Sequence, residues 1–217
     1  SNGFHYVNSA QDFRSLKPAK DRVVFVNPRL QDESAMTYAM DAAADDVSLA
    51  EMTRKGFELL DNPKGFFMMV EGGKVDWACH ANDAVSSITD VLAFDAAVAE
   101  AMRFMAKHPN DTLVIVTGNH ETGGMSLGFA GPTYDSYHTR PKNQKISYVA
   151  FDEKFSAFRK ANPQAKLEDV LPMVKENFGL VVLPQAEAAA LPKDSESAGM
   201  VLKPYEVEEL RTAFERS

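Results

Sequence analysis

The chain has 217 residues, is 45% hydrophobic and carries a formal net charge of −8. That length suits one large domain, or one domain with an excursion. The acidic balance argues against non-specific nucleic-acid binding, and no apolar run approaches the about 18 residues that a membrane helix needs. No basic segment followed by an apolar one opens the chain, so we expect no signal peptide within it. The single cysteine, Cys79, excludes an internal disulfide.

The N-terminal part of the chain predicts short elements. Residues 9–12 resemble a helix start with Ser9 as its cap. Residues 22–27 (RVVFVN) form an apolar, β-branched run that predicts a buried strand, ended by the following proline. Residues 28–47 show no clear period, and we expect them to form a loop.

Two longer helices and two further strands are predicted next. The capping-box pattern of Ser48–Glu51, in which Glu51 can reach back to the Ser48 amide, starts a helix over 48–60. Apolar residues spaced three or four apart predict a long amphipathic helix over 80–107. The apolar runs 66–70 (FFMMV) and 112–117 (TLVIVT) predict strands.

This alternation of helix and strand predicts an α/β fold: an open, mostly parallel sheet with helices on both faces. Strands 66–70 and 112–117 are apolar throughout rather than alternating, which is typical of strands covered on both sides. We expect 22–27, 66–70 and 112–117 to lie parallel in one sheet, because a crossover through helix 80–107 is right-handed.

The character of the sequence changes after Gly131, and we divide the chain into domains at 1–130 and 131–217. The second part is predicted to be mostly helical. Its expected elements are a strand at 146–151, helix over 152–178 in which Pro172 either kinks the helix or starts a second one, a helix and a loop in 184–199, and a last helix at 204–214.

Ligand-type side chains follow two of the predicted strands. Glu71, Asp76 and His80 come after strand 66–70, and Asn119 and His120 come after strand 112–117. The carboxyl ends of parallel strands share one edge of the sheet, where open α/β sheets bind ligands. Asp76 and His80 also share a face if their segment is helical.

These residue types suit metal ions. Imidazoles with carboxylates suit zinc, and a carboxylate with waters suits magnesium. Taken singly, such residues are more often solvated loop residues, caps or ordinary polar contacts. Two clusters on one predicted edge favour a metal site, although spacing alone does not name a reaction.

Two stretches resemble a known family. The sequences FFMMVEGGKVDWACHANDA, which starts at Phe66, and TLVIVTGNHETGG, which starts at Thr112, are similar to alkaline phosphatase. The resemblance is closest to bacterial members with the pattern V-E-G-G-x-x-D-x-x-x-H, and it is specific over residues 48–129. It implies a partial alkaline-phosphatase-like core over 1–130 and a helical, crown-like insert over 131–217.

The resemblance implies a site with two zinc ions and one magnesium ion. It also implies hydrolysis of phosphate monoesters through a phosphoserine intermediate, a homodimer in the intact protein, and a periplasmic or secreted location. The roles implied are magnesium ligand for Glu71, first-zinc ligands for Asp76 and His80, positions beside the second zinc for Asn119 and His120, and a substrate-proximal position for Trp77.

The chain departs from the family pattern in three ways. Asn119 stands where the family has aspartate, and a neutral amide is a weaker zinc ligand. No serine matches the nucleophile, since Ser34 lacks the surrounding motif. The last first-zinc histidine is not matched, because His138 follows His120 too soon. We interpret the chain as a middle-to-C-terminal segment that is inactive alone.

Two alternatives stay open at this stage. One is another enzyme of the same metallo-superfamily, such as a phosphodiesterase or a phosphomutase. The other is a non-catalytic domain that binds a metal or a partner protein, which Asn119 and the missing nucleophile both favour.

Overall fold

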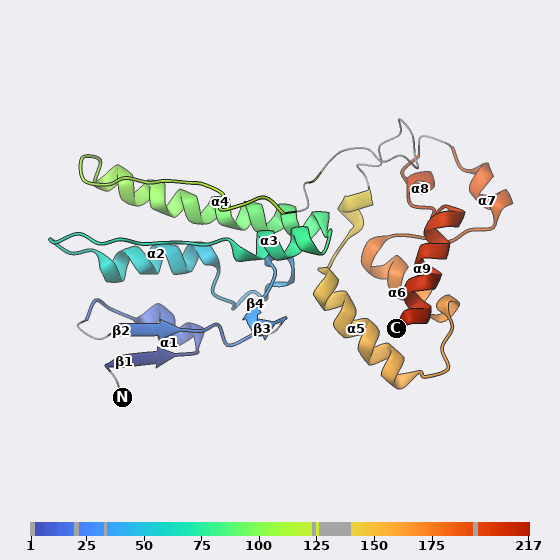
Figure 1. Cartoon of the computed structure of the whole chain (residues 1–217), viewed down its shortest axis with the longest axis horizontal. Helices are drawn as coiled ribbons and strands as arrows, with labels where there is room; N and C mark the ends of the chain where they lie inside the picture. Colours follow the sequence, from blue (N-terminus) through green and yellow to red (C-terminus); the bar gives the residue numbers. More distant parts are fainter. Residues whose placement is uncertain (1–2, 20–21, 33, 123–124, 126–139, 193–194) are drawn as a thin grey trace. The chain divides into compact units, whose positions relative to one another are not determined.

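The computed structural model describes residues 3–19, 22–32, 34–122, 125, 140–192 and 195–217 (Figure 1). The chain forms two compact units, Ser1–Gly124 and Met125–Ser217. The domain division predicted between residues 130 and 131 lies outside the described residues. Within the described ranges, no helix is both long enough and apolar enough to span a membrane.

The first unit begins with a two-stranded parallel sheet. Strand β1 (Phe4–Val7) pairs with β2 (Arg22–Phe25), and helix α1 (Ala10–Ser15) connects them. The strand predicted at 22–27 is therefore present, although shorter. The cap at Ser9 is confirmed, because its hydroxyl accepts a 3.0 Å hydrogen bond from the amide of Asp12. The buried side chains of this region are Val7, Phe13, Leu16 and Val47.

Residues 28–47, predicted to be loop, contain short regular elements. Strands β3 (Leu30–Gln31) and β4 (Ala35–Met36) pair antiparallel, and the 3-10 helix η1 (Ala39–Asp41) follows. Ser34 lies exposed in the turn between the two strands with a φ of 74°. Strands of two residues are too short to show an alternating pattern, which explains why the sequence did not indicate them.

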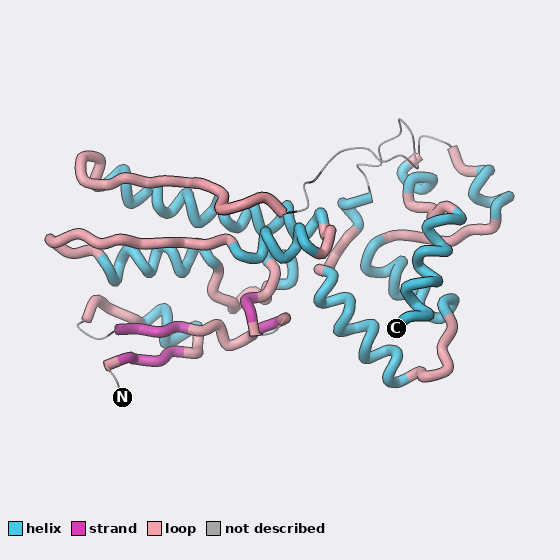
Figure 2. Tube along the Cα trace, in the orientation of Figure 1, coloured by secondary structure: helices cyan, strands magenta, loops and turns pink. Residues whose placement is uncertain are grey.

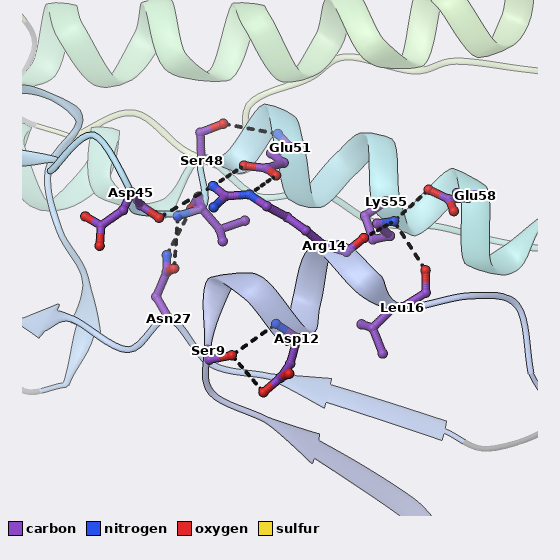
Figure 3. A network of polar contacts seen from close by, with 11 residues as sticks. Ser9, Asp12, Arg14, Leu16, Asn27, Asp45, Ser48, Glu51, Lys55 and Glu58 are labelled. Carbon is purple, nitrogen blue, oxygen red and sulfur yellow. Dashed lines mark hydrogen bonds and ion pairs between the residues drawn. The ribbon is translucent and has the colours of Figure 1, made fainter.

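Helix α2 (Leu49–Leu60) starts where predicted, and the Ser48 hydroxyl accepts from the Glu51 amide at 3.1 Å. The Glu51 side chain was also expected to reach back to the Ser48 amide. It forms an ion pair with Arg14 of α1 instead. The carboxylate of Glu51 accepts from Arg14 Nε at 2.8 Å and Nη2 at 3.1 Å, as Figure 3 shows. This hydrogen-bonded partner lowers the pKa of Glu51. Lys55 adds a second tie by donating to the carbonyls of Arg14 and Leu16.

A buried amide joins the end of β2 to the start of α2. Asn27 is 5% exposed; its Nδ2 donates to the Val47 carbonyl at 2.9 Å, and its Oδ1 accepts from the Val47 amide at 3.2 Å (Figure 3). Val47 itself has no exposed surface. Removing the side chain therefore deprives two buried backbone groups of their partner.

The Asn27→Ala variant is expected to lower the free energy of unfolding by about 2 kcal/mol, because both backbone groups of Val47 lose their partner. Asn62→Ala is a matched control: Asn62 also bonds to backbone groups, but it is exposed. Urea unfolding of both variants measures the difference. Equal losses in the two variants would contradict a special role of burial at Asn27.

Helices α3 (Gly73–His80) and α4 (Ala84–Lys107) replace the single helix predicted from residue 80. Asn82 adopts a left-handed φ of 56° between them, and Asp83 caps α4 by accepting from the Ser86 amide at 3.0 Å. The rings of Phe57 on α2 and Phe104 on α4 stack with centroids 4.6 Å apart. The two long helices therefore pack side by side, as Figure 1 shows.

The α/β class is confirmed, but the predicted pairing of 66–70 and 112–117 with 22–27 is wrong. In the described ranges the parallel partner of β2 is β1, and both other segments run extended without a strand partner (Figure 2). Composition identifies a segment suited to a sheet, but a strand also needs a neighbour along its edge. No described strand lies beside either segment.

The second unit is mostly helical, as predicted. The strand expected at 146–151 is wrong, because Ser147 caps a helix there by accepting from the Ala150 amide at 3.2 Å. Pro172 neither starts a helix nor ends one, and lies inside α6. The described elements are η2 (Arg140–Asn143), α5 (Tyr148–Ala161), α6 (Leu167–Phe178), α7 (Gln185–Ala190), α8 (Glu196–Gly199) and α9 (Pro204–Arg216), with a parallel bridge between Val181 and Val201.

Candidate functional site

Helix α3 brings two of the candidate ligands together. It begins directly after segment 66–70 and the residues Glu71 and Gly72. One helical turn separates Asp76 from His80, and the Asp76 Oδ1 lies 3.6 Å from the His80 Nε2. The His80 ring is largely exposed, whereas Asp76 is half-buried, so the pair lies at the surface with its carboxylate on the inner side.

The segment after residue 117 reaches the same carboxylate. His120 Nδ1 lies 4.0 Å from Asp76 Oδ1, and the Thr122 hydroxyl donates a 2.6 Å hydrogen bond to that oxygen. Asp76 is therefore the point at which the two motif-bearing stretches meet. Thr122 was not singled out from the sequence; its signal is a hydroxyl two residues after His120, suited to orienting a carboxylate.

The His120 ring has one nitrogen available for a ligand. Its Nδ1 lies 3.1 Å from the carbonyl oxygen of Glu121. A carbonyl only accepts, so Nδ1 carries the proton in this contact, and Nε2 keeps its lone pair. The backbone thus favours one tautomer of the ring.

Two other candidates are not drawn into this group. The Asn119 Oδ1 accepts a 3.0 Å hydrogen bond from the His120 amide, and the Glu71 carboxylate lies over Gly73, with no hydrogen bond or ion pair to any described residue. Within the described part of the chain, no three His, Cys, Asp or Glu side chains are arranged to hold a metal ion. The structure therefore gathers Asp76, His80 and His120, and leaves Glu71 and Asn119 apart.

Trp77, next to Asp76, contacts a buried cation. The Lys74 ammonium lies 4.0 Å from the centre of the Trp77 ring and 4.3 Å from the centre of the Tyr38 ring. It also donates to Asp32 Oδ2 at 3.3 Å. Burial lowers the pKa of Lys74. Lys74 thus ties α3 to residues 32–38, and it fixes one side of the indole.

A buried carboxylate lies behind this contact on α4. Asp90 accepts from the amide of Ala39 at 3.2 Å and is 8% exposed. Burial raises the pKa of Asp90 to about 6, although the Ala39 hydrogen bond and the Lys74 charge act in the opposite direction. Asp90 therefore holds η1 against α4.

Comparison with known proteins assigns the family. The family model described as alkaline phosphatase matches residues 1–177. Alkaline phosphatase 4 of Bacillus subtilis is 38% identical over 140 residues, which are 64% of this chain and 28% of that protein. The repressible alkaline phosphatase of Saccharomyces cerevisiae is 32% identical over 134 residues, or 58% of this chain and 24% of that protein.

The fold agrees with this assignment. A cold-active alkaline phosphatase from a psychrophilic Shewanella species matches with a TM-score of 0.63 at 24% identity, over 100% of this chain and 49% of that chain. The chain belongs to the alkaline phosphatase family. It spans about half the length of the Shewanella protein and about a quarter of the two curated relatives.

Proposed function

We propose that the chain is a segment of a metal-dependent alkaline phosphatase that hydrolyses phosphate monoesters through a phosphoserine intermediate. The observation that carries this proposal is the convergence of His80 and His120 on one oxygen of Asp76. These residues come from the two stretches that resemble the family, and family membership supports a phosphatase-type enzyme.

The donor types suit zinc: Asp76 and His80 would share one ion with solvent completing its shell, and His120 would stand beside a second ion, as the resemblance implies. Thr122 would orient Asp76 through its 2.6 Å hydrogen bond. The His120 nitrogen nearest Asp76 is Nδ1, which the Glu121 carbonyl holds, so the ring would bind its ion through Nε2 and not at the Asp76 oxygen itself. When bound, zinc supplies a Lewis acid that stabilises negative charge on phosphoryl oxygens.

The remaining two ligands have separate roles in the proposal. Glu71 is an exposed carboxylate suited to magnesium with water completing its shell. Asn119 would stand beside a second zinc as a neutral donor, after releasing the His120 amide. Its neutrality supports weak binding at that position, and it also favours the second candidate function, a non-catalytic metal- or partner-binding segment.

Zinc titration by calorimetry tests the site. Replacing Asp76 with asparagine is expected to weaken zinc binding by more than about tenfold, because a shared anionic ligand becomes a neutral one. Asn119→Asp is expected to tighten binding by about tenfold, since it adds a charge beside His120. Asp95→Asn is the control, because it makes the same carboxylate-to-carboxamide change at an exposed position of α4.

The zinc affinities of Asp76→Asn and Asn119→Asp separate the roles of these two residues. Unchanged affinity in Asp76→Asn would contradict the zinc site itself. Equal affinity and stoichiometry in wild type and Asn119→Asp would show that position 119 does not touch metal, and would leave Asp76, His80 and His120 as the site.

The chain on its own is not expected to turn over a phosphate monoester. No serine in it matches the family nucleophile, and the covalent step needs that residue. Phosphate release from the purified, zinc- and magnesium-loaded chain is the measurement. Steady, chelator-sensitive release that survives removal of contaminating phosphatase would contradict this expectation.

Family membership also bears on the location and assembly that we propose for the intact protein. We propose a secreted or periplasmic phosphatase that acts on phosphate monoesters and forms a homodimer. A phosphodiesterase or phosphomutase of the same superfamily is the less supported enzyme, because the relatives that match are named alkaline phosphatases.

A further inference from the structure

Helix α3 presents one face to the rest of the first unit and the opposite face to the candidate metal site. Its buried residues are Lys74 and Ala78, which lie one helical turn apart. Asp76 and His80 each follow one of these by two residues, which places them about 200° further around the helix axis. The rotation of α3 is therefore fixed on its buried face, and it determines where the two ligand side chains lie.

Lys74 makes most of the contacts on the buried face. Ala78 contributes a single methyl group, whereas the Lys74 ammonium lies 4.3 Å from the centre of the Tyr38 ring and donates to Asp32 Oδ2 at 3.3 Å. It also lies 4.0 Å from the centre of the Trp77 ring. Tyr38 has no exposed surface. Because Tyr38 and Asp32 lie outside α3, these contacts hold the first turn of the helix in one rotation.

Two further features hold the same turn. A Cβ atom added at Gly72, the N-cap of α3, would meet the Phe94 ring of α4 at 3.1 Å, so the helix starts in close contact with α4. Asp32 has a left-handed φ of 42°, which is unfavourable for a residue other than glycine. Its carboxylate nevertheless accepts from Lys74, so the strained backbone and the ion pair support one placement of the lysine.

We propose that Lys74 is a positioning residue for the metal site, because it sets the rotation of α3 that brings Asp76 and His80 to their places. Lys74 acts through the helix and not as a ligand. A rotation of about 20° moves a carboxylate about 5 Å from the helix axis by about 2 Å. A preorganised site tolerates a displacement of about 0.5 Å. Such a rotation also breaks the 2.6 Å hydrogen bond from Thr122 to Asp76.

The charge of Lys74 gives this proposal a test with a definite sign. An ammonium repels a zinc ion bound to the same helix, so electrostatics alone predicts tighter zinc binding once the charge is removed. Loss of position predicts weaker binding. The inference rests on the proposed zinc site at Asp76 and His80, and a measurement without zinc, given below, separates the two.

Zinc titration by calorimetry compares Lys74→Met with wild type. Methionine keeps most of the apolar stem, but it lacks the ammonium that contacts Tyr38 and Asp32. We expect about tenfold weaker zinc binding, which is typical when a group that orients a metal ligand is lost. Unchanged or tighter binding in the folded variant would overturn the inference.

Asn27→Ala controls for a general loss of stability. It removes two buried hydrogen bonds between the end of β2 and the start of α2, away from α3, and we expect its stability loss to be comparable. Its zinc affinity is expected to equal that of wild type. Equal weakening in Asn27→Ala and Lys74→Met would show that stability governs zinc binding, and it would overturn the inference.

Nitrogen-15 NMR of the zinc-free chain separates the inference from the proposed function. Lys74→Met is expected to shift the backbone amide resonance of Thr122, which is distant in sequence but bonded to Asp76. Asn27→Ala is expected to leave it fixed. An unshifted Thr122 resonance in Lys74→Met overturns the inference. A shifted resonance in a chain whose wild type binds no zinc contradicts the proposed zinc site and keeps the role of Lys74 in placing Asp76.

A second variant serves if Lys74→Met does not fold. Asp32→Asn removes the charge that holds Lys74, and asparagine tolerates the left-handed backbone at this position. The same shift of the Thr122 resonance is expected, by a smaller amount because both ring contacts of the ammonium remain. A Thr122 resonance identical to that of wild type in Asp32→Asn would then overturn the inference.

Discussion

Replacing Lys74 with alanine is expected to lower the free energy of unfolding by about 2–4 kcal/mol. The Lys74 side chain is 10% exposed and fills the space between Tyr38, which has no exposed surface, and Trp77. Truncation removes the packing of its stem, two cation–π contacts and the ion pair with Asp32. Urea unfolding measures the loss, and Lys64→Ala, at an exposed position, is the control.

Lys74→Met divides this effect into its parts. Methionine keeps most of the apolar stem and removes the charge, so we expect it to recover about half of the lost stability. Trp77 is the single tryptophan of the chain, and its fluorescence reports directly on the removal of the ammonium. A Lys74→Ala variant with unchanged fluorescence and stability would contradict the described contact.

The Asp90→Asn variant is expected to be more stable than wild type by about 2 kcal/mol near pH 7.5 and to lose this advantage near pH 4. Burial raises the pKa of Asp90 from 3.8 to about 6, so its charge is unfavourable in the folded protein at neutral pH. The amide oxygen of asparagine can still accept from Ala39, and this limits the loss of hydrogen bonding.

The direction of this pH dependence follows from proton binding. Between pH values near 4 and about 6 the folded protein binds more protons at Asp90 than the unfolded chain does, so stability falls as the pH rises through this window. A rise of about 2 units in the pKa of Asp90 corresponds to a loss of at most about 3 kcal/mol in the free energy of unfolding. Urea unfolding of both proteins across pH 4–8 tests it, with Asp95→Asn as control. A pH-independent difference between them would contradict the raised pKa.

Local chemistry at the starts of α1 and α2 was predictable from the sequence. The caps Ser9 and Ser48 accept the expected amides, because a hydroxyl three residues before its partner needs no distant contact to form that bond. The meeting of Asp76 with His80 follows from the helical turn that separates them. These features depend on sequence neighbours alone.

Features that depend on distant residues were not predictable. Glu51 pairs with Arg14 instead of the Ser48 amide, since an opposite charge brought close by the fold outcompetes the local partner. Segment 146–151 carries strand-forming residues, yet Ser147 caps a helix there. The partner of β2 is β1, which is only four residues long and mixes polar with apolar side chains.

The candidate site also combines features set by sequence neighbours with features set by distant residues. The sequence supplied Asp76, His80 and His120, whereas Thr122 required knowledge of how residues 119–122 fold back onto α3. The position of Asn119 could not be read from its motif, because its oxygen accepts from the next backbone amide. The segments 66–70 and 112–117, predicted as strands, have suitable composition, but pairing depends on a neighbour that no described segment provides.

Nitrogen-15 NMR of the histidine side chains during a zinc titration tests most directly the proposal that Asp76, His80 and His120 bind zinc. We expect the ring-nitrogen resonances of His80 and His120 to move with added zinc, those of His5 and His108 to stay fixed, and the movement to be lost in Asp76→Asn. Zinc binding that leaves the His80 and His120 rings unchanged would contradict it.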